Sequence, residues 1–185
     1  MDLKEMLQKG DIRSDGLAND VVGIVFNNPL YFDELFDCLR DPEDSVRAHA
    51  SDALEKILRK NKYLIIPKIS IFLDFAREET LPIVKLHYSM ITAYIYTEKA
   101  FLDDIIELLF QYLRDESIFV ATWTISSLTI IALAVESKKN MILKELQTVQ
   151  FPQSKALHNR LHRAIILLTK GGKIPKAWIK IENIK

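Results

Sequence analysis

The sequence predicts an all-α domain in which pairs of helices repeat along the chain. Three observations lead to this prediction. Glycine and proline are scarce, with 5 and 6 among 185 residues, whereas all-β domains need many turns rich in both. Apolar residues recur at the spacing of one helix face. Finally, the apolar positions realign when the sequence is shifted by 37 residues, which predicts a repeat architecture.

The composition predicts one folded domain without a disulfide framework. Apolar residues make up 49% of the chain and charged residues 27%, which is typical of globular domains and unlike disordered chains. The single cysteine, Cys38, excludes an internal disulfide and favours a reducing compartment. The N-terminal stretch MDLKEMLQKGDIR lacks the apolar run of a secretory signal. We therefore expect a cytoplasmic protein.

The clearest repeat unit is LRDPEDSVRAHASDALEKIL, residues 39–58. Its turn, RDPED, offers Asp41 as a helix N-cap and Pro42 as the first helical residue. After the turn, apolar residues recur at the spacing of one helix face. These residues are Val46, Ala50, Ala53, Leu54 and Ile57. We therefore expect this segment to form the second helix of a helix pair.

Shifting the sequence in steps of 37 residues brings equivalent residues into register in four copies. The core position Leu54, for example, is followed by Ile91, Leu128 and Ile165. The other columns are Val46, Ile83, Val120 and Leu157; Ile57, Tyr94, Ile131 and Leu168; Phe32, Ile69, Ile106 and Leu143; Leu35, Phe72, Leu109 and Leu146; and the turn pairs Arg40-Asp41, Arg77-Glu78 and Arg114-Asp115. Several columns in register without an insertion indicate an internal repeat.

Each repeat is expected to contain two helices. The first helices are expected near residues 30–40, 64–77, 101–114 and 139–148, and the second near 43–60, 80–97, 117–136 and 154–170. The repeats then span about 29–61, 62–98, 99–137 and 138–171 of a single domain, 1–185. Residues 1–28, with helices near 2–8 and 17–26, are expected to cap the array, because repeat arrays need atypical ends. Residues 172–185 form a C-terminal cap or tail.

The repeat resembles the HEAT repeat, a helix-turn-helix unit of similar length. The match is best in residues 39–58, which follow the family's D…VR…A..AL pattern with Asp41, Asp44, Val46, Arg47, Ala50, Ala53 and Leu54. The other copies keep the apolar columns but carry Val84, Ala121 and His158 in place of the arginine. The resemblance covers roughly residues 28–170 and implies a right-handed α-solenoid (an α-α superhelix) of about four HEAT-like helix pairs. It does not imply a function, because one fold supports many.

The segment SIFVATWTISSLTIIALAV, residues 117–135, carries no charge and is long enough to cross a bilayer as a helix. Its register makes it the second helix of the third repeat, equivalent to amphipathic helices in the other copies. It also contains several serine and threonine residues, which suit a lipid-facing surface poorly. We therefore expect a helix buried on several sides, and no membrane partner.

The faces of the second helices opposite the apolar columns are expected to line a groove. This face changes from charged in the first repeat to neutral in the middle and basic at the end. The candidate partner-binding residues are Tyr88, Thr92, Tyr96, Ser126, Thr129 and Arg163. Neutral surfaces with tyrosines are typical of protein interfaces. The groove therefore favours a non-catalytic scaffold that binds another protein.

Two alternatives leave the groove without an external partner. In the first, a second copy of the chain covers the neutral face by self-association, because exposed neutral patches usually mark a contact. In the second, the cover is the tail KIPKAWIKIENIK, with Ile174, Trp178, Ile181 and Ile184, if this tail folds back instead of capping the last repeat.

The last quarter of the chain is basic. Residues 1–137 carry 14 Lys/Arg against 23 Asp/Glu, a net charge of −9, whereas residues 138–185 carry 11 against 2, a net charge of +9. The candidate anion-binding residues are Lys155, Arg160, Arg163, Lys170 and Lys173. Such a cluster beside Trp178 is suited to neutralising phosphates and stacking a base, so nucleic-acid binding is the alternative function. A solvated face, or a head-to-tail contact between copies, explains the charge as well.

The histidines do not indicate a metal site. His158 and His162 share one helix face, but the sequence offers no third zinc ligand nearby, and Arg160 and Arg163 would repel a cation. His87 occupies the same column as Ala50, which predicts a packed core residue. We expect no metal and no cofactor.

An enzyme is the third alternative. Some DNA glycosylases have HEAT-like folds, with an acidic residue and aromatic residues in a basic groove. Trp123 and Trp178 would supply the aromatic residues here, but no acidic residue falls on the groove face of the last two repeats. The sequence therefore favours a binding protein without catalytic activity.

Overall fold

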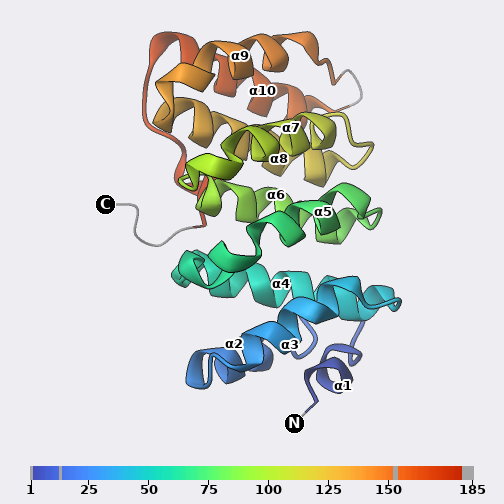
Figure 1. Ribbon diagram of the computed structural model, residues 1–185. Coiled ribbons are helices and arrows are strands. Elements are labelled where there is room, and N and C mark those ends of the chain that lie inside the picture. Colours follow the sequence, from blue (N-terminus) through green and yellow to red (C-terminus); the bar gives the residue numbers. More distant parts are fainter. Residues whose placement is uncertain (1, 13, 152–153, 181–185) are drawn as a thin grey trace.

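The computed structural model describes residues 2–12, 14–151 and 154–180, and this part of the chain is all-helical, without a strand (Figure 1). Its α-helices are α1 Leu3–Leu7, α2 Ala18–Asn27, α3 Tyr31–Asp37, α4 Asp44–Lys60, α5 Ile69–Glu78, α6 Pro82–Ile95, α7 Leu102–Tyr112, α8 Ile118–Ala134, α9 Glu136–Thr148 and α10 Lys155–Lys170. Its 3-10 helices are η1 Cys38–Arg40, η2 Lys62–Lys68, η3 Lys99–Phe101 and η4 Lys176–Trp178. Each helix expected from the sequence is found within a few residues of its expected range.

The helices stack in the order of the chain. α2, α4, α6, α8 and α10 form one series in which each helix packs against the next, and α3, α5, α7 and α9 run beside this series. Figure 1 shows α1, α2 and α3 at one end of the stack and α9 and α10 at the other. The chain that follows α10 turns back along the stack and reaches the level of α6.

The apolar repeat columns form the core of this stack. Every position in the five apolar columns is buried except Ile83, Leu143 and Ile165, which are half-buried. Burying one leucine or isoleucine contributes about 1.5–3 kcal/mol relative to leaving it in water. The period that is visible in the sequence is therefore the period at which apolar side chains stabilise the stack.

The start of α4 differs from the expected N-cap. The helix begins at Asp44, after Glu43, and not directly after Asp41. The Asp41 carboxylate instead accepts a hydrogen bond from the Glu43 backbone N–H at 3.0 Å and forms an ion pair with Lys4 at 2.7 Å. The prediction that Asp41 caps the helix is wrong, because this side chain closes the preceding turn and binds the N-terminal helix α1.

The uncharged helix α8 lies inside the stack. It packs against α6 and α10 in its own series and against α7 and α9 beside it. Most of its side chains from Val120 to Ala132 are buried. Among the described residues, the structure contains no helix with the length and apolar character needed to cross a membrane. The expectation that residues 117–135 form a helix buried on several sides is confirmed.

Candidate functional site

The chain after α10 covers part of the exposed side of the second helices. α10 ends at Lys170, and the two residues that follow, Gly171 and Gly172, have φ angles of 78° and 135°, which non-glycine residues rarely adopt. The two glycines therefore allow an abrupt reversal, after which residues 173–180 run back along the stack (Figure 1). The short helix η4 in this segment contacts α8. We call residues 174–180 the tail segment.

Trp178 anchors the tail segment. Its side chain is 5% exposed and, with Ile179 and Lys180, lines one side of a small depression between the tail segment and the helices. The helical side of this depression, which we call the tail site, consists of Met90, Ala93 and Tyr94 of α6 and Trp123, Ser127 and Ile130 of α8. The lining is mainly apolar and aromatic, which suits an indole ring. The tail site is thus a mainly apolar contact surface of the helices that a segment of the same chain covers.

Arg160 of α10 closes one side of the tail site. Its guanidinium carbon lies 5.1 Å from the ring centre of Trp178 and 5.9 Å from that of Trp123, distances at which cations interact with aromatic faces. One guanidinium nitrogen, Nη1, donates a hydrogen bond to Ser126 Oγ at 2.6 Å. Lys180 places its ammonium group 5.5 Å from the Trp123 ring centre. Two cations and two indole rings therefore meet at this point.

Side chains alone attach the tail segment to the helices. Its backbone hydrogen bonds are local, from Trp178 N–H to the Pro175 carbonyl at 2.9 Å and from Ile179 N–H to the Lys176 carbonyl at 3.2 Å. In the described part of the chain, no hydrogen bond or ion pair joins residues 172–180 to the helical stack. The attachment consists of the buried indole, the cation–aromatic contacts and the half-buried Ile174, Pro175 and Ile179.

The expected groove residues lie mostly inside the molecule. Tyr88, Thr92, Ser126 and Thr129 each have 0% exposure, so the expectation that they floor an open groove is wrong. Tyr96 is half-buried and Arg163 is exposed. The four buried residues cannot touch a partner while the helices keep this arrangement.

The second helices bury these residues by packing closely on one another through small side chains. Ser127 Oγ of α8 donates a hydrogen bond to the Ser89 carbonyl of α6 at 2.5 Å. The hydroxyls of Thr92 and Thr129 donate to carbonyls of their own helices, to Ser89 at 2.7 Å and to Ile125 at 2.7 Å. Hydroxyl groups satisfied in this way are compatible with burial, which explains why polar residues do not mark the open face.

The sequence analysis missed most of the tail site. Met90 and Ser127 belong to the Ala53 column, which was expected to face the core, yet both line the depression that Trp178 borders from the other side. The usable signals were Trp123, a large aromatic residue in a helix without charges, and the apolar tail, for which folding back was one of two alternatives. Up to Lys180 the tail does fold back; the expected contribution of Ile181 and Ile184 lies outside the described residues.

The candidate anion-binding residues fall into two groups. Lys155, Arg163, Lys170 and Lys173 are exposed, and within the described ranges they take part in no ion pair. Arg160, in contrast, is held between the two indole rings, where burial lowers its pKa. The exposed group remains available to an anion, whereas Arg160 belongs to the tail site.

His87 is a core residue, as expected. It is 8% exposed, and its Nδ1 lies 2.8 Å from Ser51 Oγ while its Nε2 lies 3.7 Å from the Asp52 carboxylate. Burial lowers the pKa of its imidazole to about 3, with smaller contributions in the same direction from Lys180 and Lys56. Ser51 has 0% exposure and lies 2.8 Å from the Ala48 carbonyl, to which it can donate. This serine, histidine and aspartate therefore form a buried polar contact between α4 and α6 without access for a substrate.

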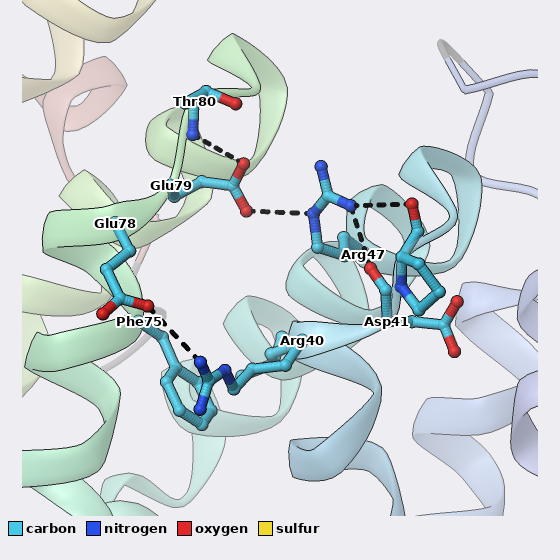
Figure 2. A pocket seen from close by; sticks show the side chains of 9 residues that line it. Arg40, Asp41, Arg47, Phe75, Glu78, Glu79 and Thr80 are labelled. Atoms are coloured by element: carbon cyan, nitrogen blue, oxygen red, sulfur yellow. Dashed lines mark hydrogen bonds and ion pairs between the residues drawn. The ribbon is translucent and has the colours of Figure 1, made fainter.

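A second depression, of about 240 Å³, lies between the turns that precede α4 and α6 (Figure 2). Arg47 crosses it: its Nε donates to the Glu79 carboxylate at 3.2 Å and its Nη1 to the Asp41 carbonyl at 2.9 Å. Glu79 in turn accepts hydrogen bonds from the backbone N–H groups of Thr80 and Leu81 at 2.8 and 2.7 Å. Since the arginine and the carboxylate already bind each other and the two turns, this cluster joins neighbouring repeats.

The described residues include no group of three or more histidine, cysteine, aspartate or glutamate side chains that could hold a metal ion. Comparison with known proteins finds no match, whether among protein-family models, curated proteins or solved structures. A function can therefore be proposed only from the chemistry of the surfaces described above.

Proposed function

We propose that this chain is a non-catalytic binding module that holds an extended segment of another protein at the tail site. The observation that carries the proposal is the tail segment itself, which lies in the site as a peptide ligand would. It buries one aromatic side chain beside a mainly apolar surface of α6 and α8 and, in the described residues, makes no backbone pairing with the helices. Aromatic anchors in small desolvated pockets are typical of residues that dominate protein–protein affinity.

We further propose that the architecture is a right-handed α-solenoid of HEAT-like repeats. Support comes from the 37-residue columns and from the stacking of helices in chain order. Such stacks expose long helical surfaces that serve as binding faces. A scaffold of this kind in the cytoplasm agrees with the single cysteine, Cys38, whose burial raises the pKa of its thiol to about 11.

Selection of peptides from a random display library on the intact protein tests the binding function. We expect enriched peptides to bind in calorimetry and to lose at least about tenfold in affinity on Ala93→Trp, because the new indole fills the tail site. Ala156→Trp is the matched control, since Ala156 is exposed on α10 and does not line the site. Peptides that bind both variants equally, or a selection that enriches none, would contradict the proposal.

Nucleic-acid binding is the second candidate function. It is favoured by the exposed cations Lys155, Arg163, Lys170 and Lys173, which form no ion pair in the described part of the protein. A protein that binds phosphates through such residues loses affinity steeply as salt rises. If this function holds, replacing Arg163 and Lys170 by alanine should reduce the salt slope by about one for each phosphate that is no longer neutralised, regardless of nucleotide sequence. A titration with labelled DNA and RNA at several salt concentrations makes the measurement.

A further inference from the structure

We infer that the tail segment is a displaceable ligand of its own protein, and that the external partner is an extended protein segment with an aromatic anchor and a lysine two residues later. This inference rests on the proposed function and names the partner's chemistry and the way in which access is regulated. In the structure, Trp178 supplies the anchor and Lys180 supplies the cation.

The tail site selects an aromatic ring with a cation beside it. Apolar side chains such as Met90 and Ile130 line the depression, and Trp123 presents a ring at its edge. The ammonium group of Lys180 lies 5.5 Å from the centre of that ring, so the electron-rich indole face is its binding partner. A competing segment therefore gains both contacts only if its cation follows its aromatic residue at the same spacing.

Arg160 makes the site more favourable for an aromatic anchor than for an aliphatic one. Its guanidinium lies between the rings of Trp178 and Trp123 and is fixed by the hydrogen bond to Ser126. When Trp178 leaves, the guanidinium keeps Trp123 on one side and exposes its other face. An incoming aromatic ring restores that second cation–aromatic contact, whereas a leucine or isoleucine does not.

The tail segment is built to leave without disturbing the stack. No backbone hydrogen bond has to break in the described residues, because none joins residues 172–180 to the helices. Gly171 and Gly172, both at positive φ, form the turn about which the tail segment would swing away, because glycine can adopt many backbone conformations. Segments with few buried contacts open at the low end of the local stability range.

The covalent connection makes the tail segment a competitor. A short flexible linker presents its end at an effective concentration of the order of millimolar. A partner then binds only the fraction of molecules whose tail is released, which weakens its apparent affinity by that fraction. The tail therefore prevents segments of low affinity from binding, whereas segments of high affinity displace it.

The experiment is a fluorescence-anisotropy titration of one labelled probe, GGKIPKAWIK, the sequence of residues 171–180. The probe is titrated with full-length wild-type protein and with full-length Trp178→Phe and Trp178→Ala variants, whose folding is checked by circular dichroism. We expect the affinity to rise from wild type through Trp178→Phe to Trp178→Ala, with a gain of at least about tenfold over the series. The graded series keeps the test informative if one variant folds poorly.

Two controls separate site binding from charge attraction. The probe GGKIPKAAIK keeps the net charge but lacks the indole, and we expect no measurable binding to any of the three proteins. The double variant Trp178→Ala/Ala93→Trp has a filled site, and we expect it to lose the binding that Trp178→Ala gains, whereas Trp178→Ala/Ala156→Trp should keep it.

Equal binding of the probe to wild type and Trp178→Ala would overturn the inference, because the tail would then not compete. Absence of binding to folded Trp178→Ala would overturn it as well, because the tail chemistry would then not be a ligand. Library peptides that need an open site at Ala93 but lack an aromatic residue followed by a lysine would leave the binding function standing and refute only the partner chemistry. Failure of both the library selection and the probe would refute both proposals.

Discussion

Helices α4 and α8 occupy the same position in the first and third repeats, and both contain 17 residues, but they are buried by different means. α8 carries no charge, and the hydroxyls of Ser126 and Thr129 donate to carbonyls of its own helix. α4 buries Glu55 to 1% exposure beside Arg59 and the Tyr94 hydroxyl, and pairs Asp52 with Lys56 at 2.6 Å. The apolar columns are shared, whereas the positions between them are not.

The contrast between α4 and α8 indicates that the apolar columns set the repeat. The positions between the columns set how each helix contacts its neighbours. Charged side chains on α4 join it to its neighbours: Lys56 donates to Asn19 of α2, and Glu55 accepts from the Tyr94 hydroxyl of α6. Neutral side chains on α8, together with Trp123, line a small depression against which the tail segment packs. The uncharged stretch that resembles a membrane span in the sequence is thus the part of the stack that the chain's own tail contacts.

The largest expected effect tests whether the columns carry the stability in both helices. Leu54 and Leu128 share one column, and both have 0% exposure. Replacing either leucine by alanine should lower the free energy of unfolding by about 2–5 kcal/mol, because each change removes buried methyl groups and leaves a cavity. Denaturant unfolding measures both. A loss below about 1 kcal/mol for Leu54→Ala alone would mean that the charged helix is held mainly by its ion pairs.

The next effect tests the positions between the columns. Glu55→Ala leaves the Tyr94 hydroxyl without its acceptor and Arg59 without its carboxylate, so we expect a loss of about 2–3 kcal/mol. Thr129 lies two repeats later in the same column, and Thr129→Val removes only a hydrogen bond within the helix, with an expected loss below about 1 kcal/mol. Thermal unfolding of both variants makes the measurement. Equal losses would show that the charge pairing of Glu55 adds nothing to the cost of changing a buried polar side chain at this position.

The third effect is a pH dependence located between α4 and α6. The pKa of His87 is about 3 in the folded protein, against an ordinary value of 6.5. Between pH 3 and pH 6.5, the unfolded chain therefore binds a proton at this residue that the folded protein does not bind. Stability should therefore be unaffected by His87 above pH 6.5 and should fall as the pH decreases below it, by at most about 1.4 kcal/mol per pH unit. The charged groups around the ring are Asp52, whose carboxylate lies 3.7 Å from Nε2, and Asp15, Lys56 and Lys180.

His87→Gln supplies the comparison for that measurement. Glutamine keeps hydrogen-bonding groups for Ser51 and Asp52 but does not titrate. Between pH 7 and pH 4.5, the free energy of unfolding should fall less with decreasing pH for the variant than for the wild type. Parallel curves would mean that the folded protein accepts the proton, which the burial of His87 argues against.

The smallest effect concerns a charge pair that is not buried. Arg40 and Glu78 lie 3.4 Å apart at the turn edge shown in Figure 2, with side chains 62% and 70% exposed. Arg40→Ala should change the free energy of unfolding by less than about 1 kcal/mol, because water screens exposed pairs. A larger loss in denaturant unfolding would point to the contact of Arg40 with the Phe75 ring, 5.0 Å away.

The sequence predicts the helices well because one physical requirement sets both the pattern and the fold. Leu54, Ile91 and Leu128 must be apolar to fill the core, and their spacing is then readable without a structure. The expected N-cap of α4 is wrong because Asp41 binds Lys4, a residue 37 positions away that no local pattern reveals. Local capping rules do not anticipate such a competing partner.

The open face of the second helices could not be predicted, because each of these helices packs against neighbours on several sides. A helical wheel distinguishes apolar from polar residues, but Ser126 and Thr129 satisfy their hydroxyls within α8 and are buried all the same. The sequence is likewise compatible with two arrangements of the tail. Only the packing of Trp178 against α6 and α8 distinguishes folding back from capping.

Trp123 and Trp178 are the only two tryptophans in the sequence, and both lie at the tail site. The tryptophan emission of this protein therefore arises from one location, where Arg160 contacts both indole rings. Emission from an indole shifts to longer wavelength when the ring passes from a buried to an aqueous surrounding. The wavelength of the tryptophan emission therefore reports whether Trp178 is buried against the helices. This measurement needs no added label.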